Sequence, residues 1–129
     1  MRDLAHNLGA VNALSPAVQA ATIKGNAIDL LGFDSVMFTV VTGAIASSGN
    51  FTITVQESDT TTDGDFTDAA ASALIGSSLV NPLTADGAFK ISYIGFKRYA
   101  RIVATKNSGT SIAAGAVAIK GRAYSKPVA

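Results

Sequence analysis

The sequence of 129 residues contains no cysteine, no tryptophan and a single histidine, His6. Without cysteine the chain cannot form a disulfide framework, a thiolate zinc site, an iron–sulfur cluster or a cysteine nucleophile. One histidine is too few for a three-histidine metal site, and neither a G-x-S-x-G motif nor a glycine-rich phosphate-binding motif occurs. These absences argue against most enzyme classes. They predict a protein without cofactors or metal, whose role is binding or structural.

Charge is also scarce, because charged residues make up 15% of the sequence and the formal net charge is +1. A balance this small does not steer a protein toward nucleic acid or an anionic membrane. No apolar run reaches the ~18 residues of a membrane span, and the start of the chain lacks the apolar stretch of a secretory signal. We therefore expect neither a nucleic-acid nor a membrane partner, and synthesis in a bacterial cytoplasm.

The few charges are unevenly distributed along the chain. Residues 1–89 carry all nine acidic residues and two basic ones, whereas residues 90–129 carry eight basic residues and no acid. If strands from both halves interleave in one sheet, these charges pair within the molecule. If they do not, the molecule has patches of opposite sign that suit repeated side-by-side contact. The sequence leaves both alternatives open.

Hydrophobic residues, 48% of the sequence, follow the pattern of β-strands from residue 20 onward. The clearest case is residues 51–57, where Phe51, Ile53 and Val55 alternate with polar residues, as expected of a strand with one buried face. Further strands are predicted at 22–24, 27–30, 35–42, 88–94, 98–105 and 112–124. The first two read as a hairpin around a Gly-Asn turn, and 35–42 is dense enough in β-branched residues for burial on both faces. Seven to eight short strands with little helix predict an all-β fold, an antiparallel and jelly-roll-like β-sandwich.

The N-terminal residues 1–19 are expected to form an extended arm, followed by a single β-sandwich domain over 20–129. Their apolar residues have near-helical spacing, which Gly9 and Pro16 interrupt, so a short helix and an extended segment docked on a neighbour are both possible. The apolar residues in question are Leu4, Leu8, Val11 and Leu14.

Two charged clusters are candidate sites. Five acidic residues lie between Glu57 and Asp68, but the register of an EF-hand loop places Ala70 where the bidentate Glu belongs, so a solvated turn competes with a weak calcium site. In the basic run Lys97-Arg98-Tyr99-Ala100-Arg101, phosphate contact competes with a structural role. We favour Arg101 pairing with an acid across the sheet.

Several phrases of the sequence resemble small proteins encoded in the head-morphogenesis modules of tailed phages, prophages and gene-transfer particles. Phe66 stands where those proteins usually carry Trp, and Ala100 where they carry Leu. The phrases are I-D-L-L-G-F-D-S at 28–35, Q-E-S-D at 56–59, D-G-x-F at 63–66, Y-I-G at 93–95, K-R-Y at 97–99 and R-I-V at 101–103.

The resemblance, which covers roughly residues 20–124, implies a non-enzymatic structural protein on the exterior of a phage head. Such a protein is a capsid decoration or cement protein, or the base of a vertex spike. Its expected partners are the major capsid protein, further copies of itself and a spike or fibre protein. The residues expected to contact capsid or neighbouring subunits are Leu4, Leu8, Val11, Leu14, Lys97, Arg98 and Arg101.

Two alternatives stand beside this reading. One is a carbohydrate- or surface-binding β-sandwich module, although such modules usually line a groove with exposed aromatic side chains and only nine aromatic residues occur here. The other is a component of the head–tail neck or the tail.

Overall fold

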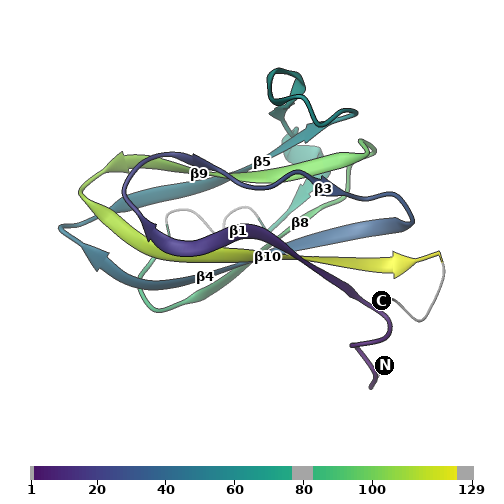
Figure 1. The fold of residues 1–129 in the computed structure, drawn as a ribbon, viewed down its shortest axis with the longest axis horizontal. Coiled ribbons are helices and arrows are strands. Elements are labelled where there is room, and N and C mark those ends of the chain that lie inside the picture. Colours follow the sequence, from purple (N-terminus) through teal and green to yellow (C-terminus); the bar gives the residue numbers. More distant parts are fainter. Residues whose placement is uncertain (1, 77–82, 125–129) are drawn as a thin grey trace.

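The computed structural model describes residues 2–76 and 83–124, and they form two antiparallel β-sheets packed face to face (Figure 1). This confirms the predicted all-β sandwich. Sheet A consists, in spatial order, of β1 (Gly9–Gln19), β10 (Ser111–Ala123), β4 (Phe33–Ala46), β8 (Ala88–Tyr93) and β7 (Leu74–Ile75). Sheet B has β2 (Ile23–Lys24) and β3 (Ile28–Asp29) along one edge, followed by β9 (Tyr99–Ser108), β5 (Asn50–Ser58) and β6 (Thr67–Asp68).

The order of the strands is that of a jelly roll. The chain crosses from one sheet to the other at β1–β2, β3–β4, β4–β5, β6–β7, β8–β9 and β9–β10. As a result, the order β1-β10-β4-β8 in sheet A faces the order β2/β3-β9-β5-β6 in sheet B, which is the arrangement of two interlocked Greek keys. The first and last long strands, β1 and β10, are neighbours although they lie at opposite ends of the sequence.

Large side chains pack against small ones in the core between the sheets. Phe38 of β4, Phe51 of β5 and Tyr93 of β8 are almost completely buried. Burial of each such ring stabilises the fold by roughly 1.5–3 kcal/mol relative to its exposure. The strands beside them, β9 and β10, contribute mostly alanine to the same cluster, namely Ala100, Ala104, Ala114, Ala116 and Ala118. Alanines leave room for the rings and let the two sheets approach closely.

Strand β4 shows why the predicted burial of residues 35–42 on both faces is wrong. Val36, Phe38 and Val40 point into the sandwich and are buried, whereas Val41, which follows them, is more than half exposed. No second layer of described residues covers the outer face of sheet A, so the β-branched residues on that side remain accessible.

The hairpin predicted around Gly25-Asn26 does not form. Ile23 of β2 pairs with Ala104, and Ile28 of β3 pairs with Ala100, so both short strands lie along the same edge of β9. They are two parts of one edge strand, interrupted where the Gly25 N–H donates to the Ile102 carbonyl. Local turn residues suggested a hairpin because the competing partner, β9, lies about eighty residues further along the chain.

The N-terminal arm is much shorter than the predicted residues 1–19. Residues 9–19 form strand β1, which pairs with β10 and brings Leu14 into the core with 2% of its surface exposed. Two irregularities in the pairing, on either side of Leu14, accommodate Pro16 in this edge strand. Of the described residues, 2–8 precede the sandwich, and they extend from the end at which β10 also finishes (Figure 1).

Leu14 and Leu4 provide a matched test of this boundary. Leu14→Ala creates a cavity in the core and is expected to lower the free energy of unfolding by about 2–5 kcal/mol. Leu4→Ala alters an exposed side chain before β1 and is expected to change it by less than about 0.5 kcal/mol. Urea denaturation of both variants measures the difference. Equal, small effects would show that residues 9–19 are an arm after all.

Candidate interaction surfaces

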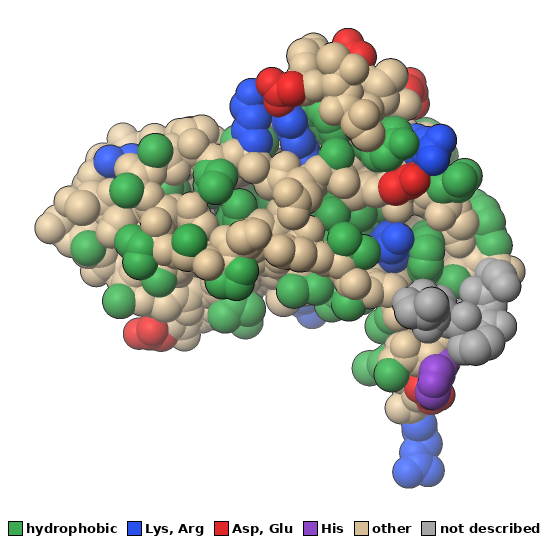
Figure 2. All heavy atoms as spheres, in the orientation of Figure 1, with side chains coloured by type: hydrophobic (Ala, Val, Ile, Leu, Met, Phe, Trp, Pro, Cys, Tyr) green, Lys and Arg blue, Asp and Glu red, His purple; other side chains and the backbone are tan. Residues whose placement is uncertain are grey.

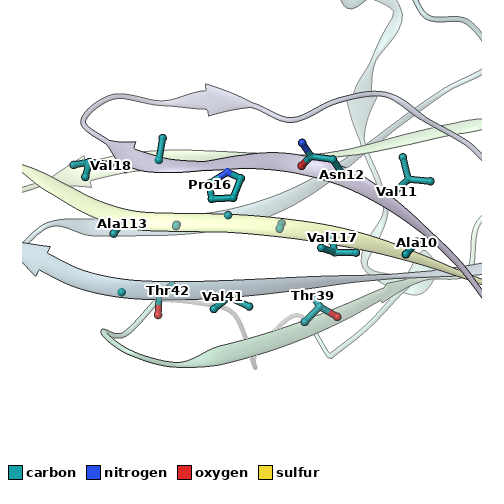
Figure 3. Close-up of a pocket in the computed structure, with 15 residues that line it drawn as sticks. Ala10, Val11, Asn12, Pro16, Val18, Thr39, Val41, Thr42, Ala113 and Val117 are labelled. Carbon is teal, nitrogen blue, oxygen red and sulfur yellow. The ribbon is translucent and has the colours of Figure 1, made fainter. Parts of the chain in front are cut away.

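The outer side of sheet A carries a broad uncharged surface, which we call the sheet A face. It is a shallow hollow of about 860 Å³ across β1, β10 and β4, and none of its lining residues is charged (Figure 3). In Figure 2, many of the charged side chains on the visible side lie at the top of the molecule and at its N-terminal tip. The lining residues are Ala10, Val11, Asn12, Pro16, Ala17, Val18, Thr39, Val41, Thr42, Gly43, Ala113, Ala114, Gly115, Ala116 and Val117.

Small residues make this surface concave. Gly115 of β10 lies under Pro16 of β1, where a Cβ atom would come within 2.9–3.1 Å of the proline ring and its Cα atom. The valines Val41 and Val117 stand exposed at its floor and rim. The hydroxyl of Thr39 is buried at the same face and has no hydrogen-bond partner among the described residues. An exposed apolar area of this kind marks a contact site more often than a free surface.

A second surface lies at the end of the sandwich where the β3–β4 and β8–β9 loops meet the end of β10. We call it the Phe96 end. It encloses a hollow of about 530 Å³ lined by residues 30–35, 93–98, Asp59, Arg122 and Tyr124. Phe96 is fully exposed at its tip. Leu31, Ile94 and Tyr124 nearby are also exposed, so several large side chains with apolar surface are accessible to solvent at this end.

The loop that carries Phe96 is held in place from below. The Tyr93 hydroxyl donates to Glu57 Oε1 at 2.5 Å and accepts a hydrogen bond from the Lys97 N–H at 3.2 Å. Burial, together with the bond to the Glu57 carboxylate, raises the pKa of Tyr93 above its ordinary value, so the phenol stays protonated as the donor. Gly95 lies against the Tyr93 ring, closer than any residue with a Cβ atom could.

The basic run forms ion pairs inside the molecule. Lys97 Nζ lies 2.9 Å from Asp59 Oδ2. Arg98 binds both carboxylate oxygens of Asp29, each at 3.0 Å. Each pair joins the basic C-terminal part of the sequence to its acidic N-terminal part, as expected if strands of both halves interleave. Lys97 and Arg98 thus border the Phe96 end, but their charges are already compensated.

Arg101 is buried and cannot contact a partner as predicted from the sequence. Its Nη1 donates to Asp63 Oδ1 at 2.6 Å, and its Nε and Nη2 donate to Gln56 Oε1 at 2.9 and 2.7 Å. The Phe66 ring covers the guanidinium, 4.1 Å from centroid to Cζ. The alternative role favoured for Arg101 holds in that it pairs with an acid, although Asp63 lies in the turn after β5 and not across the sheet. Phe66 is buried by this stack rather than in the core between the sheets.

Hydrogen bonds and ion pairs hold the acidic loop in place, both within the loop and to neighbouring strands. Asp63 binds Arg101 and also Lys24, whose Nζ lies 3.1 Å from Oδ2. The hydrogen bond from Arg101 lowers the pKa of Asp63, and the bond from Lys24 acts in the same direction. Asp65 accepts a hydrogen bond from Thr60 at 2.6 Å. No group of three or more metal-ligating side chains occurs among the described residues.

The four apolar residues predicted as contacts in the N-terminal part lie in different environments. Leu4 is exposed in the N-terminal segment, and Leu8 is half-buried, close to Gly121. Val11 lines the sheet A face, whereas Leu14 lies in the core and is unavailable. His6 pairs with Asp3 at 2.7 Å on the surface, and the hydrogen bond to His6 lowers the pKa of Asp3.

Sequence reasoning missed both apolar surfaces. The alternation of apolar and polar residues correctly predicted the inward and outward faces of several strands. It did not predict that outward valines of β4 and β10 would adjoin Pro16 of β1. A signal was present in the sequence, since Val41 and Val117 occupy positions where a half-exposed strand usually carries polar residues. The exposure of Phe96 between Gly95 and Lys97 had no such signal.

Comparisons with known proteins leave the chain without a family. No protein-family model and no curated protein matches it. One solved structure that matches is that of the infectious bursal disease virus Gx strain, at 14% identity and a TM-score of 0.45. The match covers 88% of this chain and 31% of the viral chain. A TM-score this low does not bear on function. The class of the protein therefore follows from its own strands, which define a jelly-roll β-sandwich.

In the described part of the chain, no helix is long and apolar enough to cross a membrane.

Arg101 and Lys97 provide a test of which ion pairs hold the structure. Arg101→Met removes the donor to Gln56 Oε1 and leaves Asp63 with Lys24 alone, and is expected to cost about 1–3 kcal/mol. Lys97→Met removes an exposed pair of similar length and is expected to cost less than about 1 kcal/mol. Denaturant unfolding of both variants makes the comparison. Equal losses would contradict a special role for Arg101.

The same cluster predicts a pH dependence. Because the folded state lowers the pKa of Asp63, its contribution to stability is complete above the ordinary carboxyl pKa and is lost as the pH falls through the lowered value. The wild type should therefore unfold at a higher temperature than Asp63→Asn near neutral pH, and the gap should shrink in strong acid. Thermal unfolding of both proteins across this range measures it. A gap that stays constant with pH would refute the role of the ionised carboxylate.

Proposed function

We propose that the chain is a non-enzymatic structural protein of a virion, which binds the exterior of a phage head as a capsid decoration or cement protein, or as the base of a vertex spike. The sequence phrases shared with head-module proteins support this proposal. The jelly roll agrees with it, since the fold is common in viral capsid domains, although it also occurs in lectins, and fold alone does not fix function.

The observation that carries the proposal is the contrast between polar and apolar groups on the surface. The charged side chains that looked like candidate sites, Arg98, Arg101 and Asp63, are engaged with one another or with neighbouring residues. Large apolar side chains are exposed at the sheet A face, at the tip of the Phe96 end and at Leu4. Such a surface is suited to lasting contact with protein.

Within this proposal, residues 2–8 contact the major capsid protein. They project beyond the sandwich, and Leu4 offers an exposed apolar side chain there (Figure 1). A short segment of this kind can order on a partner surface without any change in the domain behind it. Strand β1, which the sequence predicts as part of the arm, belongs to the domain and carries Val11 at the sheet A face.

One observation favours the carbohydrate-binding alternative. Phe96 and Tyr124 are exposed aromatic rings at one hollow, and the Tyr124 hydroxyl donates to Asp34 at 2.6 Å, which places a carboxylate beside them. Sugars commonly meet aromatic faces next to polar groups. Strong hits on a glycan array, abolished by Phe96→Ser, would favour this alternative over a role restricted to protein contacts.

The capsid contact is tested by adding purified protein to heads assembled without it. Wild-type protein is expected to sediment with the heads. A variant lacking residues 2–7 is expected to lose at least about tenfold in affinity, because its apolar contact is gone while its domain remains folded. Ile75→Ser, which changes an exposed side chain of sheet A outside both surfaces, serves as the control and should bind like the wild type.

Two results would count against the proposal. Undiminished binding by the shortened variant would remove the N-terminal segment from the contact. Failure of the folded wild-type protein to bind heads at all would contradict a place on the head exterior.

A further inference from the structure

Both surfaces of the domain are hollowed, but the Phe96 end, whose hollow of about 530 Å³ is lined partly by charged residues, also carries a projection. The sheet A face is a hollow of about 860 Å³, whereas the Phe96 end presents a fully exposed ring at the tip of a loop. Two hollows placed face to face would leave a void between them, and two projecting tips would touch at a point. Close packing needs a projection against a hollow.

We propose that the Phe96 end of one copy of this chain packs into the sheet A face of the next copy. The occupant of the hollow is thus a second copy, and the contact joins two different surfaces. Contacts of this type generate closed rings or extended rows rather than simple two-fold dimers. The inference deepens the proposed function, because decoration proteins stand side by side, but it is tested without any phage head.

The Phe96 loop is prepared for such a contact. The Lys97 N–H binds the Tyr93 hydroxyl at 3.2 Å, and Lys97 Nζ pairs with Asp59 at 2.9 Å, so both atoms fix the loop directly behind the ring. A projection that is already ordered loses little conformational freedom when it binds. A central aromatic side chain surrounded by polar neighbours is also the usual composition of an energetic hot spot.

The hollow is chemically matched to an aromatic ring. Its lining holds valines, alanines, a proline and glycines, with three polar uncharged residues and no charge. Next to Phe96, Lys97 and Arg98 are already neutralised by Asp59 and Asp29, so withdrawal of these two side chains from water leaves no bare charge on them.

Each surface has one basic and one acidic residue without an ion pair in the described part of the chain: Arg122 and Asp34 at the Phe96 end, Lys90 and Asp86 beside the sheet A face. Arg122 lines the Phe96 end, and Asp86 borders the sheet A face, where its N–H donates to the Gly43 carbonyl at 3.0 Å. Both residues are exposed, and neither has an ion-pair partner in residues 2–76 and 83–124. Contact between the two surfaces can pair Arg122 of one copy with Asp86 of the next.

The test uses two variants that each destroy one surface. Phe96→Ser removes the projection but keeps the hollow, and Val41→Asp spoils the hollow but keeps the projection. Sedimentation velocity over a range of concentrations is expected to show assembly of the wild type. For each variant alone, the dissociation constant is expected to rise by about tenfold or more. Ile75→Ser is the control and should assemble like the wild type.

The decisive sample is an equimolar mixture of the two variants. The intact projection of Val41→Asp fits the intact hollow of Phe96→Ser, so the mixture should form a dimer with one copy of each and nothing larger. Thermal unfolding verifies that both variants are folded, and Val117→Ser replaces Val41→Asp if the latter is not.

Three outcomes would overturn the inference: a wild type that stays monomeric at every concentration, variants that assemble as the wild type does, or a mixture that remains monomeric where the wild type associates. None of these outcomes bears on head binding by residues 2–8, so failure of the contact between copies and failure of the proposed function are distinguishable.

Discussion

The fit of large side chains against alanines between the two sheets is the constraint on which the rest of the structure depends. Phe38, Phe51 and Tyr93 fill the core, and β9 and β10 contribute mainly alanine to the same cluster. Interiors are packed about as densely as molecular crystals, so neither partner of this fit can change size freely. Small residues on β10 have a further consequence. On its outward side they leave a concave apolar surface rather than a polar one.

The pairing of charged residues follows from the order of the strands. A jelly roll places β9 between β2/β3 and β5, so a basic strand from the end of the sequence lies among acidic neighbours from its first half. Arg98 meets Asp29, and Arg101 meets Asp63, across separations of 69 and 38 residues. Charge segregated along the sequence is thereby mixed in space. Exposed apolar side chains, such as Val41 and Phe96, are then the distinctive features of the surface.

Much of the fold was predictable because period-two alternation is a local signal. Residues 51–57, 88–94 and 98–105 correspond closely to β5, β8 and β9, and the prediction of a jelly-roll-like sandwich is confirmed. Errors arose where pairing is decided at long range. The segment around Pro16 reads as an arm because the sequence does not reveal β10 as its partner, and Gly25-Asn26 reads as a hairpin turn because it does not reveal β9. The site was less predictable still. Leu14 and Arg101 are the right residue types for contacts, yet both are buried, and only Leu4 and Val11 of the apolar set remain accessible.

A domain that works by adhesion needs shape and accessible apolar area, and these are what the structure provides in its sheet A face, its Phe96 end and its N-terminal segment. A cryo-EM reconstruction of the particles that carry this protein tests that account most directly. The account predicts density for the sandwich on the outside of the head, with the N-terminal segment toward the shell. Particles that lack this density, in cells where the protein is abundant and free, would contradict it.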